Sequence, residues 1–449
     1  MDESRDWLAR SRRAVWHPCT QMKRHERLPL VPIARGDGAW LVDFDGRRYL
    51  DAVSSWWVNL FGHGHPAIKA AIKDQLDTLE HVMLAGFTHA PVVELSERLA
   101  ELSGLGHAFY GSDGASATEI ALKMSFHYWK NLGQPSKCRF VSLENSYHGE
   151  TVGALAVTDV PLFSATYAEL TRAGLRVPTP DARLALPGET DFDVAVRAAT
   201  ALENVLTKRH GEVAALIVEP LVQGAAGMAM YHPEYLRRAR AACDRYGVHL
   251  IADEIAVGFG RTGTLFACEQ AGIRPDFLCL SKGITGGFLP LSCVLTTDSV
   301  YDAFYDEDVT RGFLHSHSYT GNPLACRAAL AVLELFERDD VLAVNRAKAE
   351  RFGRLMAPLA AHDATRHFRH TGMIWAFDVD SPRADFAPAF FAAMLDKGCL
   401  TRPIGKSVYF MPPYVVGDDE IARLVEATLA TLATLAPGAA DDSPETALP

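Results

Sequence analysis

Leu250-Ile251-Ala252-Asp253-Glu254-Ile255 decides the fold class, together with Phe277-Leu278-Cys279-Leu280-Ser281-Lys282-Gly283 further along the chain. Each stretch is a short apolar run, typical of a buried strand, that ends in a polar side chain. In an open α/β sheet, the carboxyl ends of the strands border the ligand crevice. Period-two geometry also predicts that Ile255 shares a face with Asp253. We therefore expect Asp253 and Lys282 to face one crevice.

The surrounding sequence alternates apolar runs with amphipathic stretches, which is typical of crossover units on a mainly parallel sheet. The predicted strands are 140–143, 214–218, 248–252 and 277–280, and the predicted helices between them are 119–129 and 233–246. The sequence therefore predicts an α/β fold with a large domain at residues 61–325.

Both flanks of this large domain contain patterns of a smaller α+β unit. Residues 38–51 resemble a hairpin, and 323–337 and 418–436 have helical spacing. We expect 1–60 and 326–436 to form one small domain from both chain ends. Residues 437–449 are rich in Pro, Ala, Asp and Ser and are predicted to be a disordered tail.

Composition and charge exclude several classes of protein. The 449 residues are 48% apolar and 22% charged, close to the globular average. The net charge of −11 makes nucleic acid an improbable partner. We found no signal peptide and no apolar run near the ~18 residues of a membrane span. The eight cysteines form no C-x-x-C pair, so we expect reduced thiols in a cytoplasmic protein.

Asp253 and Lys282 suit the chemistry of pyridoxal phosphate. A buried carboxylate needs a cationic partner, and the protonated ring nitrogen of this cofactor is one. At ~4 Å and an effective dielectric of 20 the pair attracts by about 4 kcal/mol. Desolvation favours the neutral amine of Lys282, the form that attacks an aldehyde. Taken singly, a loop-capping aspartate and a surface ion pair are the simpler interpretations; their places at consecutive strand ends favour the cofactor.

Two further segments suit the same ligand. The small residues of Gly111-Ser112-Asp113-Gly114-Ala115-Ser116 precede a predicted helix, where backbone N–H groups can hold a phosphate. A simple N-capping turn is equally compatible with this segment. Tyr147 follows the strand at 140–143, where its ring can stack on a planar group, although a packed loop tyrosine is the simpler interpretation.

Three alternatives remain at this point. Residues 258–263 spell G-x-G-x-x-G, but the glycines start several residues after the strand, which disfavours a dinucleotide-binding oxidoreductase. The pairs His63-Gly64-His65 and His315-Ser316-His317 have no Cys or carboxylate at ligand spacing, so we predict no metal. A noncatalytic binding protein would make the coincidence of Asp253, Lys282 and Tyr147 accidental.

Three motifs resemble the class III pyridoxal-phosphate aminotransferases: Val218-Glu219-Pro220 to Gly227, Ile251 to Gly263, and Cys279 to Gly283. Four others resemble the members of that family that act in biotin biosynthesis: Trp16-His17-Pro18, Ser54-Ser55-Trp56-Trp57, Gly321 to Cys326, and Thr401-Arg402-Pro403. Each motif alone is weak. Together they are highly specific and cover nearly the whole chain except the tail.

The resemblance implies the fold type I of pyridoxal-phosphate transferases and a role for each matching residue. Lys282 would be the Schiff-base lysine and proton shuttle, Asp253 the partner of the ring nitrogen, and Tyr147 a ring-stacking residue. Gly114, Ala115 and Ile255 would complete the cofactor site. Ser318 would reach the phosphate of the neighbouring subunit, which implies a homodimer with active sites at its interface.

The resemblance further implies a reaction that converts 8-amino-7-oxononanoate to 7,8-diaminononanoate. Arg402 would bind the substrate carboxylate, and Trp56, Tyr147 and Ser316 would line the pocket, with Trp57 beside them or in the core.

The amino donor is open. S-adenosylmethionine is the favoured donor, and lysine is an alternative because Cys19 stands where the adenosylmethionine-using subgroup has tyrosine. The segment 315–320 also resembles the lysine-using relatives. Another class III activity, such as that of an ω-amino acid transaminase, is the remaining enzymatic alternative.

Overall fold

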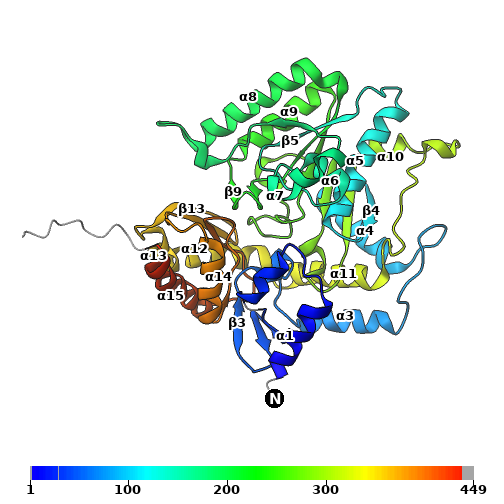
Figure 1. Ribbon diagram of the computed structural model, residues 1–449. Helices are drawn as coiled ribbons and strands as arrows, with labels where there is room; N and C mark the ends of the chain where they lie inside the picture. Colours follow the sequence, from blue (N-terminus) through cyan, green and yellow to red (C-terminus); the bar gives the residue numbers. More distant parts are fainter. Residues whose placement is uncertain (1–2, 29, 437–449) are drawn as a thin grey trace, which may run out of the picture.

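The computed structural model describes residues 3–28 and 30–436, which form a large and a small lobe (Figure 1). The large lobe is built on a seven-stranded sheet. In spatial order its strands are β4 (His107–Gly111), β12 (Ser292–Thr296), β11 (Phe277–Leu280), β10 (His249–Asp253), β7 (Val213–Val218), β5 (Arg139–Leu143) and β6 (Leu175–Val177). Only β12 runs antiparallel to its neighbours, so the predicted mainly parallel α/β sheet is confirmed.

Helices cover both faces of this sheet, and strand β7 shows why. All six of its residues are buried, and alternate side chains enter two different apolar clusters. Leu216 and Val218 pack with residues of α8 (Asp191–Arg209) and α9 (Glu234–Tyr246). Ala215 and Ile217 pack with α5 (Gly114–Asn131) on the opposite face. A continuous apolar run buried on both faces is typical of a central parallel strand.

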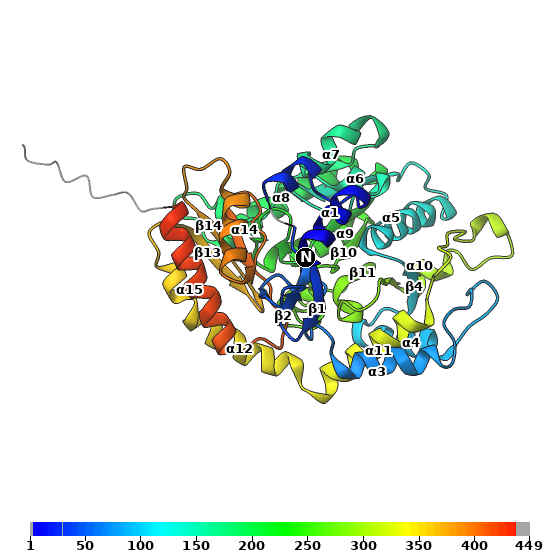
Figure 2. The same ribbon diagram turned by 60° about the horizontal axis from the view of Figure 1, so that its bottom comes forward.

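The small lobe joins the two ends of the chain. Strand β15 (Cys399–Leu400) pairs in parallel with β3 (Arg48–Asp51). In the same sheet, β3 pairs with β2 (Trp40–Asp43), and β2 pairs with β1 (Ile33–Asp37). A second, antiparallel sheet contains β13 (Thr365–Thr371), β14 (Ile374–Val379) and β16 (Ser407–Phe410). Its helices are α12 (Val341–Leu355), α13 (Ala357–Ala360), α14 (Phe386–Asp396) and α15 (Asp418–Leu435). Figure 2 shows α12, α14 and α15 on one side of the molecule.

The other elements connect or extend these lobes. Helix α11 (Pro323–Arg338) packs on α3 (Pro66–Leu76) and α4 (Ala90–Ser103) along one side of the large lobe. The remaining helices are α1 (Glu3–Ala14), α2 (Ser54–Trp57), α6 (Val152–Val157), α7 (Pro161–Ser164) and α10 (Asp298–Asp302), and strands β8 (Val222–Gln223) and β9 (Ala229–Met230) form a short ribbon. Short 3₁₀ turns are η1 (Met22–Glu26), η2 (Ala165–Leu170), η3 (Ala182–Leu184), η4 (His210–Glu212), η5 (Ala267–Ala271), η6 (Lys282–Thr285) and η7 (Val309–Arg311).

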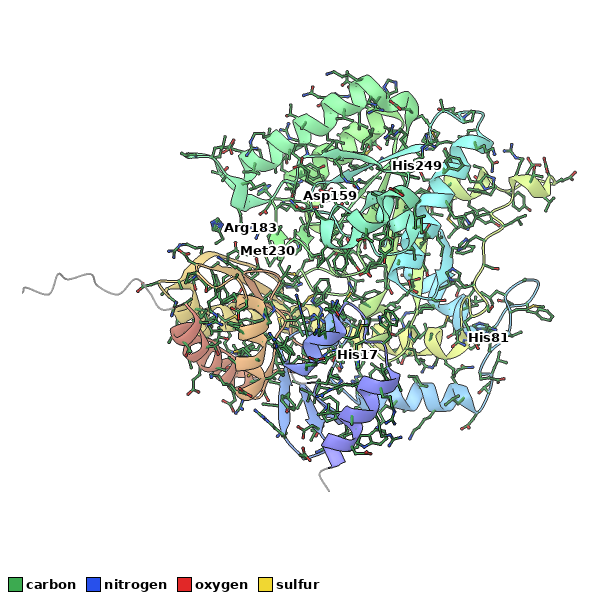
Figure 3. The ribbon with its side chains drawn as sticks, viewed as in Figure 1. His17, His81, Asp159, Arg183, Met230 and His249 are labelled. Carbon is green, nitrogen blue, oxygen red and sulfur yellow. The ribbon has the colours of Figure 1, made fainter. Side chains whose placement is uncertain are left out.

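An ion-pair network connects the lobes. Arg183 lies 2.7 Å from Asp181 of its own lobe and 3.4 Å from Asp378 on β14, and Figure 3 shows it at the boundary between the lobes. Arg369 on β13 contacts Asp378 at 3.0 Å and donates to the backbone carbonyl of Met228. These contacts fix the loop before β9 against the second sheet of the small lobe.

Each predicted strand and helix of the large lobe is present, with bounds shifted by a few residues. The helix expected at 119–129 begins earlier, at Gly114, because Asp113 caps it by accepting from the N–H of Ser116. The exact domain limits stay predictions, and the predicted tail at 437–449 lies outside the described residues. Within residues 3–28 and 30–436, no helix has the length and apolarity needed to span a bilayer.

Candidate active site

The carboxyl ends of β10 and β11 bring Asp253 and Lys282 to one edge of the sheet. The two strands are parallel neighbours, and Asp253 pairs in register with Cys279. Strand β11 ends at Leu280, so Lys282 enters the turn that follows it. Asp253 is buried and Lys282 is partly buried. Burial lowers the pKa of the Lys282 amine, and the carboxylate of Asp253 acts on it electrostatically in the opposite direction. The two groups singled out in the sequence therefore lie in one site.

Asp253 is held by two donors and is only 5% exposed. Its Oδ2 accepts from Nδ1 of His148 at 2.7 Å, and its Oδ1 accepts from the backbone N–H of Ile255 at 3.1 Å. The prediction that Ile255 shares a strand face with Asp253 was wrong, because β10 already ends at Asp253. Ile255 stays beside Asp253 through this N–H contact in the turn that follows.

Lys282 has a strained backbone and an amine removed from water. Its φ is +45°, in the left-handed region that side chains other than glycine disfavour. Its Nζ lies 4.4 Å from the centre of the Trp57 ring. Burial lowers the pKa of Lys282 to about 8, although the carboxylates of Asp253 and Glu219 oppose this shift. A substantial fraction of the amine is therefore neutral and nucleophilic near neutral pH.

Glu219 is a second buried carboxylate at this edge, just after β7. Its oxygens accept from the backbone N–H groups of Tyr147 and Gly224, each at 2.9 Å. Burial raises the pKa of Glu219 to about 7, and His148 opposes the shift. Glu219 thus fixes the loop that carries Tyr147 relative to the strand ends.

The first turn of α5 forms a crowded cup beside Ile255. A Cβ placed on Gly114 would lie 2.9 Å from Cγ2 of Ile255, so only glycine fits without movement. The backbone of Gly149 packs closely against Ala115, because a Cβ placed on Gly149 would lie 2.6 Å from the Cβ of Ala115. The early N–H groups of a helix have no partner within the helix and present positive charge. The N-capping interpretation is correct for Asp113 and leaves these N–H groups available to an anion.

Residues Ser54 to Trp57 form a left-handed turn. The turn directs the side chain of Trp57 into the protein and that of Trp56 in another direction. All four have positive φ, between +46° and +73°. Asp51 holds the turn by accepting from the N–H of Ser55 at 2.9 Å, and Ser54 donates to the carbonyl of Met411 at 2.7 Å. Trp57 is buried, with its indole N–H 3.1 Å from the hydroxyl of Tyr409. Four strained residues in sequence indicate a constraint imposed by function.

Trp56 projects the other way, into a cavity of about 520 Å³ that Arg402 also lines. Trp56 is 42% exposed, and the guanidinium carbon of Arg402 lies 4.5 Å from its ring centre. No carboxylate of the described residues lies within 4 Å of this guanidinium, so its fork is available to a ligand anion. The cavity also contains His17 of the N-terminal segment, labelled in Figure 3, and Cys19.

Tyr147 connects the buried strand ends to this cavity. Its hydroxyl donates to Oε1 of Glu150 at 2.8 Å, and the thiol of Cys19 lies 3.7 Å from the same oxygen. Burial, followed by the hydrogen bond to Glu150, raises the pKa of the Tyr147 phenol well above its ordinary value. Arg402 is near enough to Cys19 to lower the pKa of its thiol, against the larger raising effect of burial.

Ser316 and Ser318 lie on the exposed segment between η7 and α11. Within the described part of the chain neither serine hydroxyl has a hydrogen-bond partner, whereas His317 between them lies 3.4 Å from the hydroxyl of Ser112 in the cup. One chain thus assembles Asp253, Lys282, Tyr147, Gly114 and Ala115 but leaves the two serines outside.

The structure disfavours a dinucleotide site at residues 258–263. No helix begins at these glycines, and Arg261 among them is buried, donating to the backbone carbonyls of Pro412 and Asn59. Of the two histidine pairs, His63 is already hydrogen-bonded to Asp51 and Asn59. Among the residues that the structure describes, no His, Cys, Asp and Glu side chains group as metal ligands would.

Sequence reasoning missed three residues of this site: His148, Glu150 and Glu219. Glu219 follows β7, the neighbour of β10, so the strand-end argument used for Asp253 would have found it. His148 and Glu150 follow Tyr147 directly, but their partners are distant in sequence. Only the fold shows that His148 reaches Asp253.

Comparison with known proteins gives a consistent result. The family model for class III aminotransferases matches residues 21–432. The adenosylmethionine-8-amino-7-oxononanoate aminotransferase of Helicobacter pylori is 43% identical, covering 94% of this chain and 97% of that protein. The enzyme of that name from Geobacter sulfurreducens is 39% identical, covering 97% and 98%.

Solved structures agree with these sequence relatives. The adenosylmethionine-8-amino-7-oxononanoate aminotransferase of Methanocaldococcus jannaschii superimposes with a TM-score of 0.90 at 33% identity, covering 96% of this chain and 99% of that one. A PLP-bound amine transaminase from an uncultivated Pseudomonas species gives a TM-score of 0.88 at 32% identity, covering 94% and 99%.

Proposed function

The chain belongs to the class III aminotransferases, and we propose that it converts 8-amino-7-oxononanoate to 7,8-diaminononanoate, a step of biotin biosynthesis. The observation that carries this proposal is the position of Arg402 and Trp56 in one cavity, next to Cys19 and within reach of the strand-end site. A free guanidinium beside an exposed aromatic wall suits a substrate with a carboxylate at one end of an apolar chain.

Pyridoxal phosphate is the cofactor of this family, and the buried residues fit it. His148 Nε2 is buried without a partner in the described structure, although Nδ1 of the same ring is bonded to Asp253. The cup at Gly114 admits no Cβ, so backbone can approach an anion there. When bound, the cofactor supplies an aldehyde for amines to condense with and a ring that accepts electrons.

We assign the chemical roles at the strand ends as follows. Lys282 would hold the cofactor and would carry the proton that the substrate carbon loses, and a pKa of about 8 keeps both protonation states of its amine accessible. The Asp253 carboxylate would hold the ring nitrogen and favour its protonated form, and His148 orients that carboxylate. Gly114 and Ala115 would hold the phosphate through their N–H groups, and Ile255 would be part of the cofactor site.

Tyr147 would stack on the ring of the cofactor, and its hydrogen bond to Glu150 fixes the position of its phenol. Arg402 binds the substrate carboxylate, and the apolar wall of Trp56 excludes water from the methylene chain. Trp57 lies beside the Lys282 amine and shields it from solvent. These roles divide the work between a buried chemical centre and a more open binding cavity.

S-adenosylmethionine is our proposed amino donor, in keeping with the names of the relatives. Its sulfonium is a cation, and the Glu150 carboxylate is an anion that lies 3.7 Å from the thiol of Cys19, a residue of that cavity. Lysine is the competing donor, since its side-chain ammonium would suit Glu150 as well.

We further propose a cytoplasmic homodimer in which Ser318 completes the phosphate site of the neighbouring subunit and Ser316 borders its substrate. Large apolar side chains are exposed on two segments that lie side by side around these serines: Met83 and Phe87 on one, Leu314 and Tyr319 on the other. The contact between the rings of His81 and Tyr319, 5.0 Å apart, joins these segments. An exposed apolar patch of this kind is typical of a subunit interface.

The test is an assay of the purified holoenzyme with the keto acid and each donor offered separately. Formation of 7,8-diaminononanoate with S-adenosylmethionine, and complementation of a biotin auxotroph, would support the proposal. Product formed only with lysine would reassign the donor. Failure with both donors, together with turnover of simple amines, would instead favour an ω-amino acid transaminase, the class to which several structural neighbours belong.

A further inference from the structure

A second cavity, of about 600 Å³, lies on the outer surface of the large lobe, away from the strand ends. It is bordered by the outer face of α5, the start of α6, the beginning of β5 and the residues 310–314. Its lining shares no residue with the cavity of Arg402 and Trp56. No step of the proposed reaction uses it.

The cations around this cavity outnumber the carboxylates four to one. Lys123, Lys130, Arg139 and Arg172 line it, and Glu119 is the one acidic side chain. Glu119 is already engaged, because its Oε1 accepts from the N–H groups of Gly153 at 2.7 Å and Ala154 at 3.3 Å. Such a local excess of positive charge is unusual in a chain whose net charge is −11.

These four cations form no salt bridges within the described residues. Within the described residues, none of the four lies within 4 Å of a carboxylate oxygen. The Nε of Arg139 is buried without a hydrogen-bond partner, and its Nη2 makes only a 3.3 Å bond to the carbonyl of Ala173. Arg172 contacts only the sulfur of Cys138, at 3.4 Å. A buried guanidinium donor with no acceptor is costly unless a ligand supplies one.

Apolar side chains form the rest of the lining. Leu122, Phe126, Val152 and Phe313 contribute hydrocarbon surface, and Phe126 and Val152 are exposed. The Lys123 ammonium lies 5.7 Å from the ring centre of Phe313 and donates to Nδ1 of His315 at 2.7 Å. The cavity therefore combines two guanidinium forks with a hydrocarbon wall.

We propose that this cavity is a binding site for a small organic anion with an apolar body, such as a medium-chain carboxylate. The anion would bridge the guanidinium groups of Arg139 and Arg172, while its chain would cover Phe126 and Val152. Planar guanidinium forks suit carboxylate oxygens, and the hydrocarbon wall favours a chain over a bare ion. This inference does not depend on which substrate the active site uses.

The test is isothermal titration of the holoenzyme carrying Arg402→Ala, a change that removes the other carboxylate-binding arginine. Hexanoate is the probe, acetate is the control that lacks the apolar body, and 1-hexanol is the control that lacks the anion. We expect one hexanoate per chain, bound at least about tenfold more tightly than either control. Equal affinities for hexanoate and acetate, or no hexanoate binding, would overturn the proposal.

Two variants locate the bound hexanoate. Arg139→Gln/Arg172→Gln should weaken it by about tenfold or more, because both forks are lost. Val152→Glu keeps every cation but places a competing carboxylate at the edge of the cavity. This variant should also bind hexanoate more weakly. The matched control is Arg237→Gln/Arg238→Gln on α9, where both arginines already pair with Glu234. Unchanged affinity in the double cavity variant would refute the site; a thermal midpoint equal to that of the Arg402→Ala parent shows that the variant folds.

Discussion

The two sides of the active site are built in opposite ways. On the cofactor side, Asp253, Glu219 and Lys282 follow three adjacent strands; both carboxylates are buried, and the Lys282 amine is desolvated. On the substrate side, Cys19, Trp56, Glu150 and Arg402 come from separate loops and are exposed. The sheet therefore fixes the groups that handle the proton and the ring, whereas exposed segments of both lobes carry the groups that choose the substrate.

This difference predicts how each side responds to change. A buried charge in a rigid frame has no replacement, so its loss should abolish the chemistry. An exposed side chain on a loop contributes binding energy that neighbours can partly replace. We therefore expect effects of mutation to fall steeply from the strand ends to the rim.

The largest effect should come from Lys282→Ala. This change removes the only amine at the strand ends among the described residues, and we expect turnover to fall by at least about four orders of magnitude. Borohydride should then no longer attach the cofactor to the chain, as measured by mass spectrometry. Lys208→Ala, on the exposed face of α8, is the matched control. Retained turnover in Lys282→Ala would show that the groups at the strand ends can be replaced, contrary to the contrast drawn above.

Arg402→Ala should have the next largest effect. The loss leaves the substrate carboxylate unpaired beside Trp56. We expect kcat/KM for the keto acid to fall by a factor that corresponds to about 2 to 5 kcal/mol of lost transition-state stabilisation. A ketone of the same chain length without the carboxylate provides the control, because its kcat/KM should be unchanged. If both ketones lose equally, Arg402 supports the fold of the cavity and does not bind the substrate.

The pH dependence of cofactor attachment tests the buried end on a smaller scale. Only the neutral amine attacks an aldehyde, and the pKa of Lys282 is lowered to about 8. The rate at which apoenzyme takes up pyridoxal phosphate should therefore rise with pH, by about tenfold between pH 7 and pH 9. Absorbance during reconstitution measures it. A midpoint near the ordinary lysine value would mean that water reaches Lys282.

The sequence predicted the rigid side better than the open side. Strand β10 could be predicted from its apolar run, and parallel neighbours then had to present Asp253 and Lys282 at one edge. The left-handed turn at Ser54 to Trp57 could not be predicted, because it depends on Asp51 and on Met411, which lies far along the chain. No local pattern specifies where such long-range contacts hold a strained backbone.

The same physical reason explains the errors near the site. Ile255 was expected on a strand, but the strand stops where the N–H of Ile255 turns back to Asp253. Glu150 carries no pattern of its own and acquires its place from Tyr147 and Cys19. Roles that depend on tertiary contacts were inferred from family resemblance, and those of Ser316 and Ser318 stay predictions.

The smallest effect should come from Cys19→Tyr, which tests whether the open side sets the amino donor. A phenol there would add a polar donor beside Glu150 and an aromatic face in the Arg402 cavity. One hydrogen bond or aromatic contact is worth about 0.5 to 1.5 kcal/mol, so we expect kcat/KM for S-adenosylmethionine relative to lysine to rise by about two- to tenfold. Cys19→Ser keeps the size and the contact to Glu150 and should leave the ratio unchanged. A shift as large as that of Arg402→Ala would show that this rim position is as constrained as the buried end, and the contrast between the two sides would fail.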